Sequence, residues 1–190
     1  MQEMVYEYEK GQPSVLLNRG KCGNYEYLVI SLGRHPCGYV CLPKDNKNFG
    51  KFYDDIDIDC HGGLTFSNET ISFLEYSDKY KCMVRTSIED KWIIGWDYAH
   101  YGDYTAFDRT GKRYSTQAIT LECQYVIMQL ITEEINDTID RITKKVEENP
   151  TEQNQALLEE AKDYYATMVK QMYKLGEAIW CPMILFLKSL

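Results

Sequence analysis

Two short segments of the sequence combine histidine, aspartate and glycine, residue types from which catalytic and binding sites are built. Residues 54–66 read Asp-Asp-Ile-Asp-Ile-Asp-Cys-His-Gly-Gly-Leu-Thr-Phe, and residues 92–103 read Trp-Ile-Ile-Gly-Trp-Asp-Tyr-Ala-His-Tyr-Gly-Asp. They contain two of the three histidines of the chain. Because loops at strand ends commonly carry function, we predict one site from both segments. Its predicted ligand-binding residues are His61, Gly62, Gly63, Thr65, Trp96, Asp97, His100 and Asp103.

A metal centre is one chemistry that these residues support. His61, Asp97, His100 and Asp103 supply two imidazoles and two carboxylates, a set that suits Zn, Mn or Fe. A bound ion of this kind would activate water for hydrolysis. The His-Glu-x-x-His spacing of many metallohydrolases is absent. The sequence alone therefore decides neither whether the protein binds a divalent metal nor whether it is an enzyme.

A pocket that binds a ligand without transforming it is a second interpretation. The backbone N–H groups of Gly62 and Gly63 could cradle a phosphate or carboxylate, and Thr65 adds a hydroxyl. Trp96 and nearby tyrosines could stack on a base. This interpretation predicts a small, anionic, nucleotide-like ligand.

A structural role is the third interpretation, with Gly62-Gly63 as a tight turn and His100 as a loop anchor. Other signatures are missing, because the sequence has no P-loop, no dinucleotide fingerprint and no Gly-x-Ser-x-Gly motif. Zinc bound through His35, Cys37 and Cys41 is disfavoured, since the two cysteines lie on a predicted strand, where cysteine acts as a small apolar residue.

Composition narrows the classes of partner. The net charge of the 190 residues is −8, which argues against general nucleic-acid binding because phosphate neutralisation needs a basic surface. The longest apolar stretch, residues 178–187, is shorter than the roughly 20 residues that a membrane span requires. The polar N-terminal segment predicts no export signal, so the seven cysteines are expected to be free thiols in a cytoplasmic protein.

The first 114 residues read as a β-rich domain that positions the candidate site. An apolar run at residues 92–96 predicts a buried central strand, and strict alternation at residues 56–60 predicts a half-buried one. Two further runs, 70–76 and 80–86, predict a hairpin. The remaining strands are expected at residues 5–9, 25–32, 38–42 and 64–66. Most of their pairing should be antiparallel.

Residues 115–190 read as a helical hairpin, which makes the predicted fold class α+β. Apolar residues recur at spacings of three and four between Ala118 and Val146, after a predicted N-cap at Ser115. A second helix is expected to start with Asn149 as N-cap and Pro150 at its first position, and Pro182 should disrupt it. The hairpin could complete the core or mediate homo-oligomerisation.

Four pieces of the sequence resemble motifs of an uncharacterised family of small phage and prophage proteins. The family pattern is Cys-Gly-Tyr-Val, Tyr-Asp-Asp, His-Gly-Gly-Leu-Thr-Tyr/Phe and Gly-Phe/Trp-Asp-x-Ala-His-x-Gly-Asp. The matching pieces are residues 37–40, 53–55, 61–66 and 95–103, and the similarity continues through residues 114–130 without covering the second helix. The resemblance implies a phage accessory protein of the bacterial cytoplasm, of a kind that includes anti-defence factors sequestering nucleotide signals.

Three functional hypotheses follow from the residues and the resemblance. The first is an oligomeric phage accessory protein that sequesters a small nucleotide-like ligand. The second is a metal-dependent hydrolase that uses His61, Asp97, His100 and Asp103. The third is a protein-interaction module acting through the helical hairpin.

Overall fold

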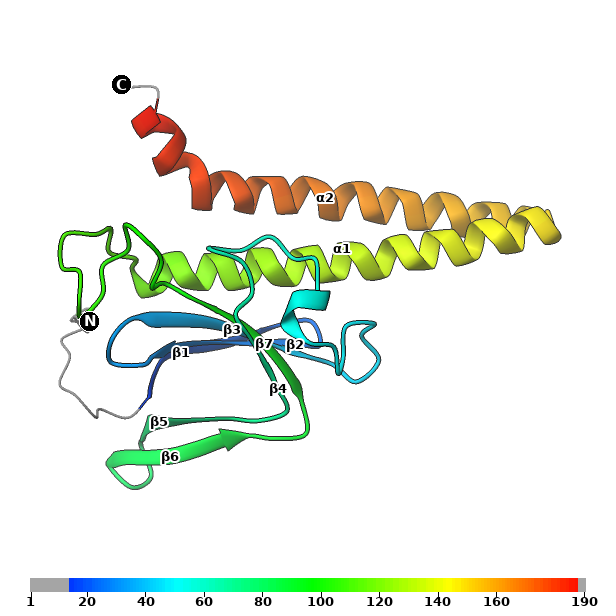
Figure 1. Ribbon diagram of the computed structural model, residues 1–190. Helices are drawn as coiled ribbons and strands as arrows, with labels where there is room; N and C mark the ends of the chain where they lie inside the picture. Colours follow the sequence, from blue (N-terminus) through cyan, green and yellow to red (C-terminus); the bar gives the residue numbers. More distant parts are fainter. Residues whose placement is uncertain (1–13, 188–190) are drawn as a thin grey trace. The chain divides into compact units, whose positions relative to one another are not determined.

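The computed structural model describes residues 14–187, with side chains through Gln171 and at Lys174. It confirms the α+β class, with a curled sheet followed by two helices that form a hairpin (Figure 1). The predicted strand at residues 5–9 lies outside the described part. The strands are β1 (Val15–Cys22), β2 (Tyr25–Ser31), β3 (Pro36–Leu42), β4 (Phe66–Asn68), β5 (Ile71–Ser77), β6 (Cys82–Ile88) and β7 (Trp92–Asp97).

The seven strands form one sheet in the order β4-β7-β3-β2-β1-β5-β6. All pairings are antiparallel except the one between β1 and β5, where Val15 lies opposite Leu74. The backbone N–H of Leu74 donates to the carbonyl of Ser14 at 2.7 Å, which joins the β5–β6 hairpin to the rest of the sheet. The prediction of a mostly antiparallel sheet with a hairpin at this position is confirmed.

The three central strands carry buried side chains on both faces, because β2, β3 and β7 consist almost entirely of apolar and aromatic residues. Successive side chains of a strand point to opposite faces. One face of the sheet therefore contains a buried cluster that includes Leu28, Tyr39 and Ile93. Ile94 and Trp96 lie on the other face, together with the start of the first helix, α1 (Thr116–Glu148).

Two glycines of the central strands make room for large aromatic rings. Gly38 lies directly opposite Trp96, and Gly95 lies directly opposite Tyr39. A Cβ atom on Gly38 would be 2.6 Å from the Trp96 ring, and one on Gly95 would be 2.3 Å from the Tyr39 ring. Each ring therefore lies across a neighbouring backbone that has no side chain.

The variant Gly95→Ala is expected to lose about 1–3 kcal/mol of unfolding free energy, since overpacking a filled core forces side chains and backbone to shift. Chemical denaturation measures the loss. The matched control makes the same change in a Tyr39→Leu background, where the obstructing ring is gone and the additional loss should be smaller. Equal losses in the two backgrounds would show that the Tyr39 ring is not the obstacle.

Residues 56–60 do not form the predicted strand. A short 3-10 helix, η1 (Tyr53–Asp55), precedes them, and the segment itself is extended but pairs with no strand. Ile56, Ile58 and Cys60 are nevertheless buried, while the aspartates between them are exposed. The alternation of apolar and acidic residues therefore predicted the buried side chains correctly, but the predicted pairing with another strand is wrong. A period of two shows only which side chains face the core.

The β1 strand was not predicted, and the strand expected at residues 64–66 begins two residues later, at Phe66. β1 contains Asn18, Arg19, Gly20 and Lys21, which carry no β signal of their own. Its pairing with β2 also shifts register between Leu16 and Asn18. Such a strand is specified by its neighbours more than by its own residues.

The helix boundaries follow local capping interactions. Ser115 caps α1 as predicted, since its Oγ accepts the N–H of Ala118 at 3.1 Å. The second helix, α2 (Glu152–Leu187), is capped by Thr151 and not by Asn149, because the N–H of Asn154 donates to the Thr151 hydroxyl at 3.2 Å. α2 also continues through Pro182, so the proline does not end the helix as predicted. A proline inside a helix removes one backbone hydrogen bond and can bend the helix without ending it.

The chain divides into two compact units, Met1–Gln124 and Tyr125–Leu190, with the boundary inside α1. The first turns of α1 belong to the sheet unit, because Asn18 donates to the Thr120 hydroxyl at 2.8 Å and the Cys123 thiol lies 3.9 Å from the Leu28 carbonyl. In the second unit, Asn136 of α1 donates to the Tyr165 hydroxyl of α2 at 3.3 Å.

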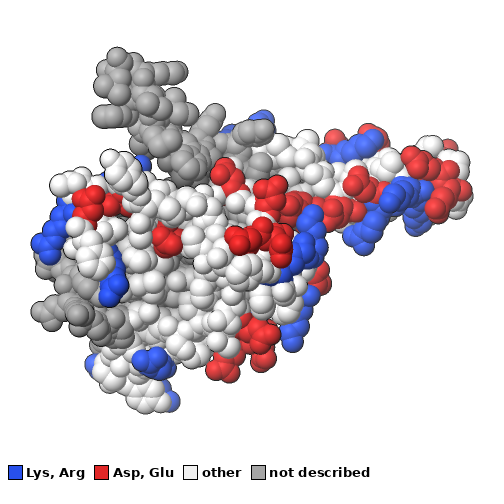
Figure 2. All heavy atoms as spheres, in the orientation of Figure 1, with Lys and Arg blue, Asp and Glu red and all other residues white. Residues whose placement is uncertain are grey.

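Charges of both signs are interspersed along the helical hairpin in the face that Figure 2 shows. Among the described residues, neither helix combines the length and the apolar content that crossing a bilayer requires. The apolar residues 183–187 lie outside the part with described side chains.

Candidate metal centre

A tight turn at the end of the extended segment positions His61. The N–H of Gly63 donates to the carbonyl of Cys60 at 3.1 Å. Gly62 and Gly63 both have positive φ, +69° and +85°, which side-chain-bearing residues rarely adopt. The two glycines thus build the turn that holds His61. The Gly63 N–H is used within it, which does not support the predicted anion cradle.

A second turn, just after β7, positions His100 and Asp103. The N–H of Asp103 donates to the His100 carbonyl at 3.0 Å, and the N–H of His100 donates to Asp103 Oδ2 at 2.9 Å. Lys112 pairs with this turn from the other side, since its N–H donates to the Gly102 carbonyl at 2.7 Å. Asp103 is 4% exposed, and its backbone N–H is held within the turn.

The two turns bring His61, His100 and Asp103 together. His61 Nε2 is 2.8 Å from Asp103 Oδ2, and His100 Nδ1 is 3.6 Å from the same oxygen. One potential ligand atom from each residue lies within 4.8 Å of the others. In the described part of the chain, His100 Nδ1 is buried and makes no hydrogen bond. A buried imidazole nitrogen without a partner is costly unless something binds it.

These distances are close to those that a metal ion imposes. Ligand atoms bound to a tetrahedral ion at about 2.0–2.1 Å lie about 3.3 Å apart. The His100–Asp103 separation of 3.6 Å suits this geometry, and the His61–Asp103 pair at 2.8 Å has to open slightly. The side chains of His61 and His100 are 17% and 35% exposed, so an ion can reach them from solvent.

Aromatic rings fix the orientation of the two imidazoles. The His61 ring stacks on Tyr98, with centroids 4.6 Å apart and planes at 8°. It also contacts Tyr114 at 4.9 Å and meets the His100 ring edge-on at 5.2 Å. A Cβ atom on Gly62 would be 2.0 Å from the His100 ring, so the bare backbone of Gly62 forms one wall of the site.

Glu122, on the first turns of α1, binds two groups of the site through hydrogen bonds. It was not predicted as a site residue. Its carboxylate accepts the backbone N–H of His61 at 2.6 Å and the hydroxyl of Tyr98. The indole N–H of Trp96 donates in turn to Tyr98 at 3.3 Å. Burial raises the pKa of Glu122, and burial followed by the Glu122 charge raises the pKa of Tyr98.

A sequence signal for Glu122 exists on an apolar stripe of α1. This stripe lies beside the predicted seam, which is the set of apolar residues that recur between Ala118 and Val146. Ile119, Cys123, Val126 and Leu130 are fully buried and recur at spacings of three and four, whereas Ala118, Leu121 and Tyr125 of the predicted seam are only half-buried. Glu122 lies on the buried stripe and is 4% exposed. A carboxylate at such a position needs partners, and that requirement marks it as a candidate site residue.

Replacing Glu122 with leucine is expected to lower the free energy of unfolding by about 2–4 kcal/mol, because the His61 N–H and the Tyr98 hydroxyl both lose a buried acceptor. Glu122→Gln retains one acceptor oxygen and should lose less. Urea denaturation of the two variants measures the difference. If Glu122→Leu is as stable as the wild type, these two hydrogen bonds are not supporting the site.

The other predicted site residues lie elsewhere. Asp97 and Trp96 are neighbours on β7, so their side chains point to opposite faces of the sheet. Asp97 accepts the Thr65 hydroxyl at 2.9 Å and the Ala99 N–H at 3.0 Å, and these two side chains border a different cavity. Trp96 is 1% exposed and packs over Gly38, which leaves its ring unavailable for stacking on a base. The described cluster of possible metal ligands thus contains three of the four predicted ligands.

Cys60 lies beside His61 but is not poised as a thiolate ligand. Burial, followed by the charge of Glu122, raises the pKa of its thiol to about 12. Burial also raises the pKa of Tyr114 to about 12, with the Asp103 charge as the next cause. The imidazoles of His61 and His100 and the Asp103 carboxylate therefore remain the candidate ligands of the cluster.

Comparison with known proteins gives no family for the chain. No protein-family model, no curated protein and no solved structure matches it. A function has to be argued from the geometry of His61, His100 and Asp103.

Proposed function

We propose that the protein binds one divalent transition-metal ion through His61, His100 and Asp103 and that the ion activates water for hydrolysis. The observation that carries the proposal is the convergence of three ligand atoms within 4.8 Å, one of them the buried, unbonded Nδ1 of His100. Two imidazoles and one carboxylate suit Fe, Mn or Zn and leave positions open for water and substrate. A bound ion lowers the pKa of its water ligand and so supplies a nucleophile at neutral pH.

The charges around the site favour a cation over a directly bound anion. Asp103 contributes a carboxylate to the cluster, and Glu122 lies directly behind His61. The N–H groups of His61 and Gly63 donate to protein acceptors and so are not displayed to an anion. A metal ion would neutralise the Asp103 carboxylate and would itself attract an anionic molecule.

The loaded site is proposed to take an anionic, nucleotide-like substrate. The ammonium of Lys112 lies 4.5 Å from the centroid of the Tyr114 ring, and Tyr114 contacts His61. A positive group is therefore held next to the aromatic stack that includes a proposed metal ligand. Such an arrangement favours a substrate with a phosphate near the ion and an unsaturated ring near the tyrosine.

Sequestration without turnover is a second candidate function for the same residues. It is favoured by the position of Lys112 over Tyr114, which supports binding whether or not water is activated. In this alternative the protein acts as a phage accessory factor that removes a nucleotide signal from a bacterial host. The two candidates differ in one observable, namely whether a bound nucleotide is recovered chemically unchanged.

Metal analysis followed by an activity assay tests the proposal. The protein is stripped with a chelator, titrated with Zn²⁺, Mn²⁺ or Fe²⁺, and then incubated with linear and cyclic nucleotides. The expected result is one ion per chain for at least one metal and product formation only in the loaded protein. Metal binding with intact nucleotide recovered from the complex would support sequestration. Failure of every ion to bind stoichiometrically would rule out both the centre and the hydrolase.

A further inference from the structure

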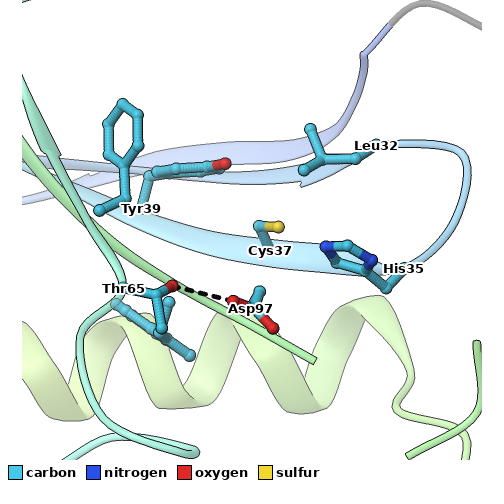
Figure 3. A pocket seen from close by; sticks show the side chains of 8 residues that line it. Leu32, His35, Cys37, Tyr39, Thr65 and Asp97 are labelled. Atoms are coloured by element: carbon cyan, nitrogen blue, oxygen red, sulfur yellow. Dashed lines mark hydrogen bonds between the residues drawn. The ribbon is translucent and has the colours of Figure 1, made fainter. Parts of the chain in front are cut away.

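A cavity lies on the face of the sheet to which the Tyr39 and Asp97 side chains point, opposite the face of the Trp96 side chain. Its volume is about 190 Å³, and it is bordered by Leu32, His35, Cys37, Tyr39, Thr65, Phe66, Trp96 and Asp97. Figure 3 shows the side chains of His35, Cys37, Tyr39 and Asp97 arranged around this common space. The cavity combines apolar walls with a few convergent polar groups, which is the usual character of a small-molecule site.

Asp97 is the charged group of this cavity, and its carboxylate has hydrogen-bond acceptor positions that no group in the described part of the chain uses. A carboxylate offers about four lone-pair positions. One Asp97 oxygen accepts the Thr65 hydroxyl at 2.9 Å, and the other accepts the Ala99 N–H at 3.0 Å. These two bonds hold the carboxylate in a fixed orientation. Each oxygen can still accept one hydrogen bond from a ligand.

The remaining polar groups of the cavity add no positive charge. Burial lowers the pKa of His35, so its imidazole is neutral at physiological pH. Cys37 and Tyr39 share a hydrogen bond, and burial raises the pKa of the thiol to about 12 and raises the pKa of the hydroxyl. The cavity lining therefore has a net negative charge that belongs to Asp97.

Aromatic rings form part of the wall. Tyr39 and Phe66 meet edge-to-face, with ring centroids 5.4 Å apart. The faces of such rings attract cations and flat unsaturated groups. An apolar cavity of about 150 Å³ is large enough for benzene. The space of about 190 Å³ can therefore hold one substituted six-membered ring.

We propose that this cavity is a binding site for a small planar cation of the amidinium or guanidinium type, whose two N–H groups bind the Asp97 carboxylate and whose flat part packs against the aromatic wall of Tyr39 and Phe66. A fork of two parallel N–H donors matches a carboxylate in geometry and in charge. The cavity shares no lining residue with the proposed metal centre, because none of the three metal ligands borders it.

Benzamidine is the probe that tests the site, with benzamide and benzoate as neutral and anionic controls of the same shape. Isothermal titration of the metal-free protein should show benzamidine binding in a one-to-one complex. Benzamide should bind at least about tenfold more weakly, since a hydrogen bond to a charged partner is worth more than one to a neutral group. Benzoate should not bind.

Three variants locate the bound probe. Asp97→Asn should weaken benzamidine binding by about tenfold or more. Leu32→Phe should also block binding, because it fills the cavity without altering the carboxylate. His61→Ala should leave binding unchanged. Circular dichroism checks that each variant folds. Benzoate binding as well as benzamidine, unchanged affinity in both cavity variants, or loss of binding in His61→Ala would each overturn the proposal.

Discussion

Replacing His100 with alanine is expected to lower the affinity of the protein for its divalent ion by more than about a hundredfold. Changes to groups that only support a metal ligand already cost about tenfold to a hundredfold in affinity, and loss of the ligand itself costs more. His100 Nδ1 is the buried nitrogen without a hydrogen bond, so its removal leaves no protein group unsatisfied. Metal content after dialysis, measured by mass spectrometry, provides the readout.

The chain offers a matched control for this change. His35 is the remaining histidine and borders the cavity on the other face of the sheet. His35→Ala should therefore retain a full equivalent of metal. Asp103→Asn adds a sharper test, because an amide oxygen can still accept the His100 N–H but is a poorer ligand for a transition metal. Equal metal content in His35→Ala and His100→Ala would contradict the assignment of His100.

Gly62→Ala is expected to disrupt the centre although the new side chain is a single methyl group. The added Cβ would lie 2.0 Å from the His100 ring, so the imidazole has to leave its present position in the cluster. The substitution also places alanine at a φ of +69°, which costs roughly 1–2 kcal/mol by itself. Both stability and metal affinity should fall, as thermal unfolding and metal titration would show.

Gly63→Ala separates these two causes. Gly63 has a φ of +85°, and no atom lies within 4 Å of the Cβ position. This variant should have a similar backbone cost to Gly62→Ala but should keep its metal. If both variants lose metal to the same degree, the backbone turn is the cause. In that case the contact between Gly62 and His100 is not part of the site.

The sequence predicted the parts of the fold that local patterns determine. The apolar run of β7 predicted a strand buried on both faces, and the predicted ranges of β2, β3 and β7 agree closely with the observed strands. Ser115 was predicted as an N-cap because a hydroxyl before a helix accepts a free N–H. β1 could not be found in the same way, since its polar residues are held in a strand by pairing with β2.

Part of the candidate site was also predicted from local sequence patterns. His61, His100 and Asp103 lie in turns marked by glycine, and local sequence shows where such turns fall. Asp97 was grouped with them because it is close to His100 in sequence. Strand alternation, however, places Asp97 on the face opposite Trp96. The face to which the Asp97 side chain points therefore excludes it from the site, although Asp97 is close to His100 in sequence.

Glu122 required tertiary information. Its partners, His61 and Tyr98, are distant in sequence, and the apolar stripe around Glu122 does not show which groups its carboxylate binds. Its burial follows from the contact between the first turns of α1 and the sheet unit. The hydrogen-bond partners of a buried polar side chain are therefore the part of a site that is hardest to predict from one sequence.

Anomalous diffraction at the metal edge, from crystals grown with Zn²⁺, tests the central claim most directly. The expected result is one strong peak at about 2.0–2.2 Å from one nitrogen of His61, Nδ1 of His100 and an oxygen of Asp103. The same data should show no comparable peak beside Asp97. A peak held by other residues, or no peak at a Zn²⁺ concentration that saturates the protein in solution, would contradict the proposed centre.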